Sequence, residues 1–333
     1  MACLFQRSNK IFYLVATYRG RRVWRSMGVK TRTDAKIVAR RDFPQLLQSN
    51  RVPMFQDFTV EFLTHARANL APKTVGTYNR AIASFVSEMG NRRLDLYSPR
   101  DVEQFKVQRV SRVSPTTVNI EFRCLKALFQ TAIRWEYIKR NPFTGIGQFR
   151  THPRSIQFIT QEEFQILLEA IAYPWYKDLV KFAVSTMMRA GELVNLTWNS
   201  VDLKRRVVLV ESTARHTLKT GRSHAVPMND WVFSFLSSQT ITSGFVFRFT
   251  DGRQLNVGYI SGLFRRCLRR TELSHEFSFH SLRHTGASWL VQSGATLYEV
   301  QQLLGHTSTS TTQIYAHLSA NALHDTVNRI NIQ

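Results

Sequence analysis

Four separated stretches in the second half of the 333-residue chain carry side chains that could do chemistry on an anion. A phosphodiester under attack carries charge on its non-bridging oxygens, to which two arginines can offer bidentate hydrogen bonds and a histidine a further one. Each residue alone has an ordinary explanation, such as a helix cap, a solvated turn or a packed ring. The stretches are "STMMRAGELVNLTWNSVDL" with Arg189, "HTLKTGRSHAVPM" with Lys219, "HSLRHTGAS" with His280 and Arg283, and "LLGHTSTSTTQIYAHL" with His306 and Tyr315.

Tyr315 could be the attacking group at such a phosphate. A tyrosine hydroxyl has a pKa near 10, so about one in a thousand is ionised at pH 7, at a cost of roughly 4 kcal/mol. A cationic cluster would supply part of that cost, and Lys219 is the candidate acid that protonates the leaving oxygen. Glu192 is close enough in sequence to orient Arg189.

The histidines have a rival use in metal binding. His280 and His284 are spaced i,i+4, as in the H-E-x-x-H zinc motif, but Ser281 follows His280 and the neighbouring arginines repel a cation. We therefore predict no metal and no other cofactor. His284 and His317 are expected to be packed or bonded to the backbone.

The charge of the chain indicates a polyanionic partner. Lysine and arginine total 45 against 23 acidic residues, which gives a net charge of +22 and a pI near 10.6. Such a field favours nucleic acid, although charge alone does not separate DNA from RNA or anionic lipid. Residues 1–51 hold twelve of the basic side chains and two acids, so about half of the excess lies in the first sixth of the chain.

Apolar patterning and cysteine spacing indicate the cellular setting. No uninterrupted apolar run approaches the roughly 18 residues of a membrane helix, and the N-terminus lacks the apolar stretch of a signal peptide. We therefore expect no membrane association and a location in the cytoplasm or on the nucleoid. Cys3, Cys124 and Cys267 are odd in number and widely spaced, which predicts buried thiols rather than disulfides or a metal site.

Residues 1–51 predict a small β-sheet followed by one helix. Apolar and polar residues alternate in "KIFYLVATYRG" and "RRVWRSMGVK", and Gly20 supplies the turn between these strands. The stretch "TDAKIVARRDFPQLLQ" predicts a helix with Thr33 or Asp34 as its N-cap. The residues expected on its apolar side are Ile37, Val38 and Leu46.

Residues 53–145 predict an all-α unit. Its four helices are expected at residues 55–69, 72–90, 98–110 and 114–138. The second helix has Val75, Ile82 and Phe85 on one face. The fourth has an apolar stripe of Val118, Phe122, Leu125, Phe129 and Ala132, opposite the basic Arg123, Lys126 and Arg134.

Residues 146–155 predict a linker, because the stretch "NPFTGIGQFRTHPRS" contains Pro, Gly and basic residues without periodicity. Residues 156–333 predict a mainly helical mixed α/β unit. It is expected to have helices at 160–172 and 176–188, two or three strands around Lys219, and helices to the end.

The four reactive stretches, in this order, resemble the catalytic domain of the tyrosine recombinases, the phage-integrase family. "RAGELVNLTW" resembles the first-arginine box, Lys219 stands where the hairpin lysine falls, "HSLRHT" resembles the H-x-x-R box, and "LLGH" followed by Tyr315 resembles the last box. These matches span residues 186–317. The chain departs from the family at Met187, where the family commonly has glycine, which bears on the local turn and leaves Arg189 in place.

The resemblance implies a site-specific DNA recombinase. Tyr315 would attack the scissile phosphate, form a 3′-phosphotyrosyl link and release a 5′ hydroxyl, and the stored ester would allow rejoining without ATP. Arg189, Arg283 and His306 would hold the phosphate. His280 would support proton movement or orientation.

The resemblance also implies domains and partners. Residues 1–51 resemble an arm-type DNA-binding domain, 53–145 a helical, SAM-like core-binding domain, and 156–333 a catalytic domain. The implied partners are double-stranded DNA at core and arm sites, three further copies in a homotetramer, a DNA-bending host factor and an excision factor, for the integration or excision of a phage or mobile element. The basic residues expected to contact DNA are Arg19, Arg21, Arg22, Arg25, Arg80, Arg123, Lys126 and Arg134.

Two other functions remain open from the sequence. A type IB topoisomerase uses the same chemistry but relaxes DNA without exchanging strands, so strand exchange distinguishes the two. A recombinase-derived DNA-binding protein without catalysis is the other alternative. The full set of Arg, Lys, His and Tyr side chains argues against it.

Overall fold

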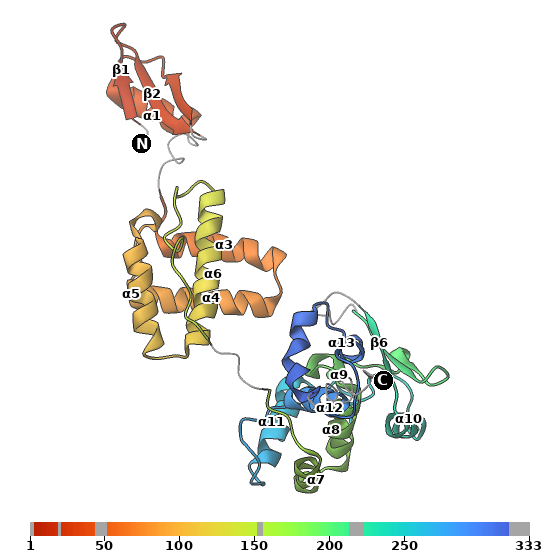
Figure 1. The fold of residues 1–333 in the computed structure, drawn as a ribbon. Helices are drawn as coiled ribbons and strands as arrows, with labels where there is room; N and C mark the ends of the chain where they lie inside the picture. The colour runs from red at the N-terminus through yellow and green to blue at the C-terminus, as the bar shows by residue number, and fades with distance from the viewer. Residues whose placement is uncertain (1–2, 19–20, 44–51, 152–155, 213–222, 320–333) are drawn as a thin grey trace, which may run out of the picture. The chain divides into compact units, whose positions relative to one another are not determined.

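The computed structural model describes residues 3–18, 21–43, 52–151, 156–212 and 223–319. The chain divides into two compact units, Met1–Pro153 and Arg154–Gln333. In the first unit, a small sheet with one helix and a helical bundle have separate cores, and the second unit combines helices with another small sheet (Figure 1). This arrangement confirms the predicted fold class. Among the described residues, no helix is long and apolar enough to cross a bilayer.

The N-terminal part is an antiparallel sheet in the order β1-β2-β3 with one helix packed on it (Figure 1). Leu14 and Ala16 alternate into the core from the central strand, because successive side chains of a strand point to opposite faces. They meet Ala35 and Ala39 of the helix there. The elements are β1 (Cys3–Gln6), β2 (Phe12–Tyr18), β3 (Arg21–Ser26) and α1 (Arg32–Asp42).

The sequence predictions differ from this part in three respects. Strand β1 is additional, and its short, mostly exposed run gave no alternation to detect. Helix α1 begins after Thr31, whose hydroxyl accepts the Asp34 N–H at 3.2 Å, so neither Thr33 nor Asp34 is the N-cap. Ile37 is 59% exposed instead of packed, and Leu46 lies outside the described residues.

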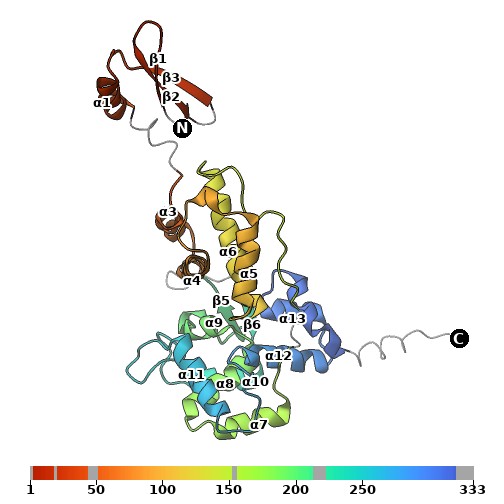
Figure 2. The same ribbon diagram turned by 90° about the vertical axis from the view of Figure 1, so that its left-hand side faces the viewer.

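The helical bundle has a core of phenylalanine rings. The Phe85 ring centroid lies 5.1 to 6.0 Å from those of Phe55, Phe105, Phe129 and Phe143, distances at which aromatic rings attract one another. The predicted apolar faces of the second and fourth helices are confirmed as buried. The helices are α3 (Phe55–Asn69), α4 (Pro72–Met89), α5 (Pro99–Val110) and α6 (Pro115–Arg134), and Figure 2 shows the last two side by side.

The chain that follows α6 is fastened to the bundle as far as Phe149. The Asn119 side-chain amide donates to the Phe149 carbonyl and accepts the Phe149 N–H, both at 2.9 Å. The Lys106 ammonium donates to the Gly147 carbonyl at 2.6 Å. These bonds satisfy backbone groups that would otherwise need water. Part of the stretch predicted as a linker, 146–155, therefore packs on α5 and α6.

The second unit contains seven α-helices in its described residues and a sheet in the order β4-β5-β6 (Figure 1). Two short 3₁₀ segments, Thr309–Thr311 and Gln313–Ser319, follow the last α-helix. The strands are β4 (Val201–Asp202), β5 (Val207–Val210) and β6 (His224–Pro227). The helices are α7 (Gln161–Ala170), α8 (Pro174–Thr186), α9 (Ala190–Val194), α10 (Asp230–Ser237), α11 (Val257–Leu268), α12 (Ser281–Gln292) and α13 (Leu297–Leu304).

Helix α12 is held from two directions. A Cβ atom at Gly286 would overlap the Val184 carbonyl oxygen and lie 2.7 Å from Met187 Cγ, so the glycine lets α12 approach the end of α8. Towards α7, Ile159 donates its N–H to the Thr285 hydroxyl at 3.0 Å and accepts the Trp289 indole N–H at 3.0 Å. The helix that carries the "HSLRHT" stretch is therefore firmly placed.

The three cysteines differ in exposure. Cys267 in α11 is buried, Cys124 is partly buried, and Cys3 on the short strand β1 is exposed. The prediction of buried thiols is therefore right for Cys267 and wrong for Cys3.

Replacing Gly286 should test the close approach of α12 and α8. We expect Gly286→Ala to lower the free energy of unfolding by about 1–3 kcal/mol, because the added methyl group meets a backbone carbonyl that cannot move aside. The matched control is Gly262→Ala in α11, where a Cβ atom meets nothing within 4 Å. That change should stabilise the protein by roughly 0.5–1 kcal/mol. Equal urea denaturation midpoints for the two variants would contradict this interpretation.

Candidate active site

Arg283 of α12 is the centre of the candidate site. Its guanidinium is 3% exposed and donates to the Met187 carbonyl at 2.7 Å and the Leu304 carbonyl at 2.6 Å. The same group donates to Nε2 of His306 at 3.1 Å. Burial, and then the positive charge of Arg189, lower the pKa of Arg283 to about 10, so it stays charged at pH 7. One buried cation thus joins the ends of α8 and α13 to the histidine of the last box.

Met187 occupies the turn where the family commonly has glycine. It is the C-cap of α8 in the left-handed conformation, with φ 51° and ψ 22°. A residue other than glycine costs roughly 1–3 kcal/mol in such a conformation. The Met187 side chain is buried against Ala287, Leu304 and Tyr315, which offsets part of that cost, and its carbonyl accepts from Arg283. Met187 therefore adopts a backbone conformation that favours glycine while its side chain joins the core.

Arg189 lies at the N-terminus of α9 and is oriented by Glu192, as its spacing suggested. Glu192 accepts the Arg189 backbone N–H at 2.8 Å and a guanidinium N–H at 2.7 Å. The Glu192 side chain is almost fully buried, whereas the Arg189 side chain remains 23% exposed. The pair is therefore a buried carboxylate that holds a partly exposed guanidinium near Arg283.

The hydrogen bonds of His306 fix which of its ring nitrogens carries the proton. Arginine can only donate, so Nε2 of His306 must accept from Arg283. The proton then lies on Nδ1, which donates to the Thr312 hydroxyl at 3.0 Å. Burial, and then the charges of Arg283 and Arg189, lower the pKa of His306 to about 4. His306 is therefore neutral at pH 7, and a bound anion would favour protonation of Nε2.

Tyr315 is both a packed ring and part of the cationic cluster. It is 1% exposed, on the 3₁₀ segment Gln313–Ser319, and packs with Val300 and Leu304 of α13. Its hydroxyl lies 2.7 Å from Nδ1 of His284. Burial raises the pKa of Tyr315 to about 12, and the charge of Arg283 opposes that rise. The phenol is therefore protonated at pH 7.

The structure corrects the predictions for two histidines. His284 was expected to be packed or bonded to the backbone, yet its side chain bonds to the Tyr315 hydroxyl. Its i,i+4 spacing from His280 places the two rings 4.9 Å apart, nearly perpendicular. His317 is exposed instead of packed, because it lies on the outer side of the 3₁₀ segment.

His224 of β6 is a further site residue that the sequence reasoning missed. A Cβ atom at Gly305 would lie 2.7 Å from its ring, so the imidazole packs directly on the turn before His306. Its Nδ1 is buried without a hydrogen-bond partner in the described part of the chain. Burial is the main cause that lowers the pKa of His224. The strand alternation that it shares with the buried Val226 was the available signal.

The remaining predicted residues are placed as follows. Lys219 and Arg19 lie outside the described residues, as does the turn between β5 and β6, and the side chain of Arg21 is not described. His280 is exposed at the start of α12. In the N-terminal sheet, Arg22 lies over the Trp24 ring at 5.5 Å. The other predicted DNA-contact residues are exposed, namely Arg25, Arg80, Arg123, Lys126 and Arg134.

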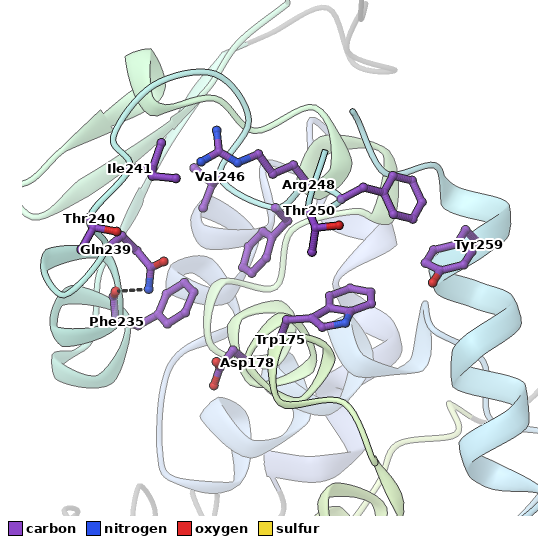
Figure 3. Close-up of a pocket in the computed structure, with 12 residues that line it drawn as sticks. Trp175, Asp178, Phe235, Gln239, Thr240, Ile241, Val246, Arg248, Thr250 and Tyr259 are labelled. Atoms are coloured by element: carbon purple, nitrogen blue, oxygen red, sulfur yellow. Dashed lines mark hydrogen bonds between the residues drawn. The ribbon is translucent and has the colours of Figure 1, made fainter. Parts of the chain in front are cut away.

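A cavity of about 440 Å³ elsewhere in the second unit has aromatic walls. Figure 3 shows Trp175, Phe235 and Tyr259 among the side chains around it. Neither arginine of the cluster nor Tyr315 lines this cavity. Within the described ranges, no group of three His, Cys, Asp or Glu side chains is arranged to hold a metal ion. The candidate site is therefore the arginine–histidine–tyrosine cluster.

Comparison with known proteins gives the same picture as the geometry. A family model described as "Phage integrase family" matches residues 157–322, and one described as "Phage integrase, N-terminal SAM-like domain" matches residues 57–139. The integrase of Salmonella phage P22 is 28% identical over 225 residues, which cover 62% of this chain and 55% of that protein. The tyrosine recombinase XerC of Pediococcus pentosaceus is 25% identical over 283 residues, which cover 80% and 93%.

A solved structure has a similar fold. The lambda integrase tetramer bound to a Holliday junction matches with a TM-score of 0.68 and 19% identity, over 92% of this chain and 96% of that one. At this identity the likeness concerns the fold alone.

The histidines of the cluster should titrate well below the ordinary pKa of about 6.5. Between pH 6.5 and 4 the unfolded chain then binds more protons than the folded chain, so stability should fall as pH falls through this window. Ring-nitrogen NMR should show His284 and His306 turning cationic near pH 4, with each signal assigned by substitution. Titration of both near pH 6.5 would refute this account of the cluster.

Proposed function

This chain belongs to the phage integrase family of tyrosine recombinases, and we propose that Tyr315 is the nucleophile with which it cuts DNA. As a member of that family, it is a site-specific DNA recombinase. The observation that carries the proposal is the position of Arg283. Its guanidinium bonds to His306, its charge acts on the Tyr315 hydroxyl, and the charge of Arg189 acts on it in turn.

The scissile phosphate would be held by Arg189, Arg283 and His306. Both arginines are cations whose donors suit the non-bridging oxygens, and preorganised donors can each contribute a few kcal/mol at a developing charge. The Tyr315 oxygen would release its proton to solvent and form a bond to phosphorus while the bond to the 5′ oxygen breaks. That oxygen would leave as a hydroxyl with a proton from Lys219. The 3′-phosphotyrosyl ester would keep the bond energy for rejoining, so no ATP is needed.

A bound DNA phosphate would change the protonation of His306. His306 is neutral because burial and two arginines suppress its protonation. A bound phosphate would offset those charges, so Nε2 could take up a proton and donate to the phosphate. His280, exposed at the start of α12, would support proton movement or orientation. Tyr315 must also gain access to the phosphate, because its ring is buried in this state.

The DNA and subunit partners follow from the relatives. We expect double-stranded core DNA to contact the basic faces of residues 53–145 and 156–333, and arm DNA to contact residues 1–51. We also expect a homotetramer, because the lambda integrase structure is a tetramer on a Holliday junction. A DNA-bending host factor and an excision factor complete the expected set, for integration or excision of a phage or mobile element in the host cytoplasm.

Removal of the Tyr315 hydroxyl should abolish covalent capture of DNA. Mixed with a nicked cognate site, the wild-type protein should form an SDS-resistant adduct in EDTA, and Tyr315→Phe should form none. The matched control is Tyr298→Phe, which changes a 69% exposed tyrosine on α13 and should leave the adduct intact. An adduct that persists in Tyr315→Phe would reject the assignment. Supercoil relaxation without strand exchange would instead favour a topoisomerase.

The exposed basic face of α6 should contribute to DNA affinity through phosphate contacts. Arg123→Ala combined with Lys126→Ala should weaken core-site binding and reduce the slope of log K against log salt by about 2, one counterion per lost contact. The matched control is Arg93→Ala, whose guanidinium is already paired with Asp95 at 2.6 Å and which should change the slope little. An unchanged slope in the double variant would place the DNA on another face.

A further inference from the structure

The proposed function gives no role to His284, whose side chain is hydrogen-bonded to Tyr315. Nδ1 of His284 lies 2.7 Å from the Tyr315 hydroxyl oxygen, within the range of a good hydrogen bond. The two ring centroids are 6.0 Å apart and the planes are tilted by 46°. The imidazole therefore meets the phenol at its polar end and leaves the rest of the Tyr315 ring to its apolar neighbours.

The chemistry of the two groups decides which one donates. A phenol O–H is a stronger acid than a neutral imidazole N–H, and an unprotonated imidazole nitrogen is a stronger acceptor than a phenol oxygen. Burial, and then electrostatic repulsion from His280 and Arg283, lower the pKa of His284 to about 4, so its ring is neutral at pH 7. Tyr315, with a pKa of about 12, keeps its proton. The Tyr315 hydroxyl therefore donates to Nδ1 of His284.

The two partners differ in how they are held. His284 follows Arg283 directly on α12, and this helix is fixed by the close contact at Gly286 and by the bonds of Thr285 and Trp289 to Ile159. Tyr315 lies on a short 3₁₀ segment that follows a run of Ser and Thr residues. A rigid helix thus offers the acceptor and a less regular segment brings the donor.

We propose that His284 is a positioning residue for the nucleophile, which holds the Tyr315 hydroxyl beside Arg283 in the site of its own chain. The proposal rests on the role of Tyr315 in the proposed function. Without this bond, the hydroxyl of a 1% exposed tyrosine would lose the partner that satisfies it, and a buried unpaired hydroxyl is unfavourable. The phenol would then leave its pocket to reach water, and its oxygen would lose its place near the arginines.

Positioning describes this contact better than proton abstraction does. Burial raises the pKa of Tyr315 and lowers that of His284, so transfer of the proton from the phenol to the imidazole is strongly disfavoured. A hydrogen bond without transfer has no such obstacle. His284 therefore fixes where the oxygen lies, and the arginines of the site act on its charge.

Three variants of the full-length chain test the proposal on a nicked core site. His284→Leu keeps an apolar side chain of similar bulk without an acceptor, and it should slow single-turnover adduct formation by about 10- to 100-fold, with DNA affinity unchanged. His284→Asn places an amide oxygen near the position of Nδ1 and should restore the rate to within about threefold of wild type. His317→Leu, which changes an exposed histidine on the same segment as Tyr315, is the control and should match wild type.

The outcomes separate this proposal from the proposed function. If His284→Leu forms the adduct as fast as the wild type or faster, the positioning role is overturned, while Tyr315 remains the nucleophile. If His284→Leu forms the adduct slowly and His284→Asn is equally slow, the positioning role is also overturned, because the packing of the imidazole would then be the important property. Failure of the proposed function itself would show as an adduct that Tyr315→Phe still forms. Thermal melting of each variant establishes that the compared proteins are folded.

Discussion

A buried guanidinium must keep its charge and satisfy its donors, and the candidate site is arranged around this requirement. Removing an arginine from water is costly unless acceptors replace the lost hydration. Arg283 finds two backbone carbonyls and one imidazole nitrogen, from the ends of α8 and α13 and from His306. The acceptors come from two separate stretches of the sequence, Met187 at the end of α8 and residues 304–306 at the end of α13, so these two helix ends must meet at Arg283. The close contact at Gly286 is what allows α8 and α12 to do so.

The charge of Arg283 also helps to set the protonation states of the neighbouring side chains. Positive charge and burial together keep His284 and His306 neutral, and burial keeps Tyr315 protonated. The two arginines are thus left as the charges that an incoming phosphate would meet. Glu192 already offsets the charge of Arg189, and a phosphate would supply a further negative charge beside Arg283.

The parts of the fold that follow from periodicity could be predicted from the sequence. The faces of α4 and α6 are buried as expected, because a repeating apolar stripe leaves a helix one way to pack. Strand β1 and the Thr31 cap could not be found, since a four-residue edge strand has no pattern and a cap depends on local backbone angles. For the site, the order of four short boxes in the sequence predicted Arg189, Arg283, His306 and Tyr315 as site residues. The bond of His284 to Tyr315 was not predictable, because it joins residues 31 apart whose contact depends on tertiary packing.

The contact of His224 with Gly305 has a consequence for how the chain can vary. Gly305 ends α13 with φ 60°, and any side chain there would collide with the imidazole on β6. A larger residue at position 305 is compatible with the fold only if position 224 becomes smaller at the same time. Strand β6 and the box that carries His306 are therefore in direct steric contact. A segment from a relative that carries a side chain at position 305 would therefore meet the His224 ring.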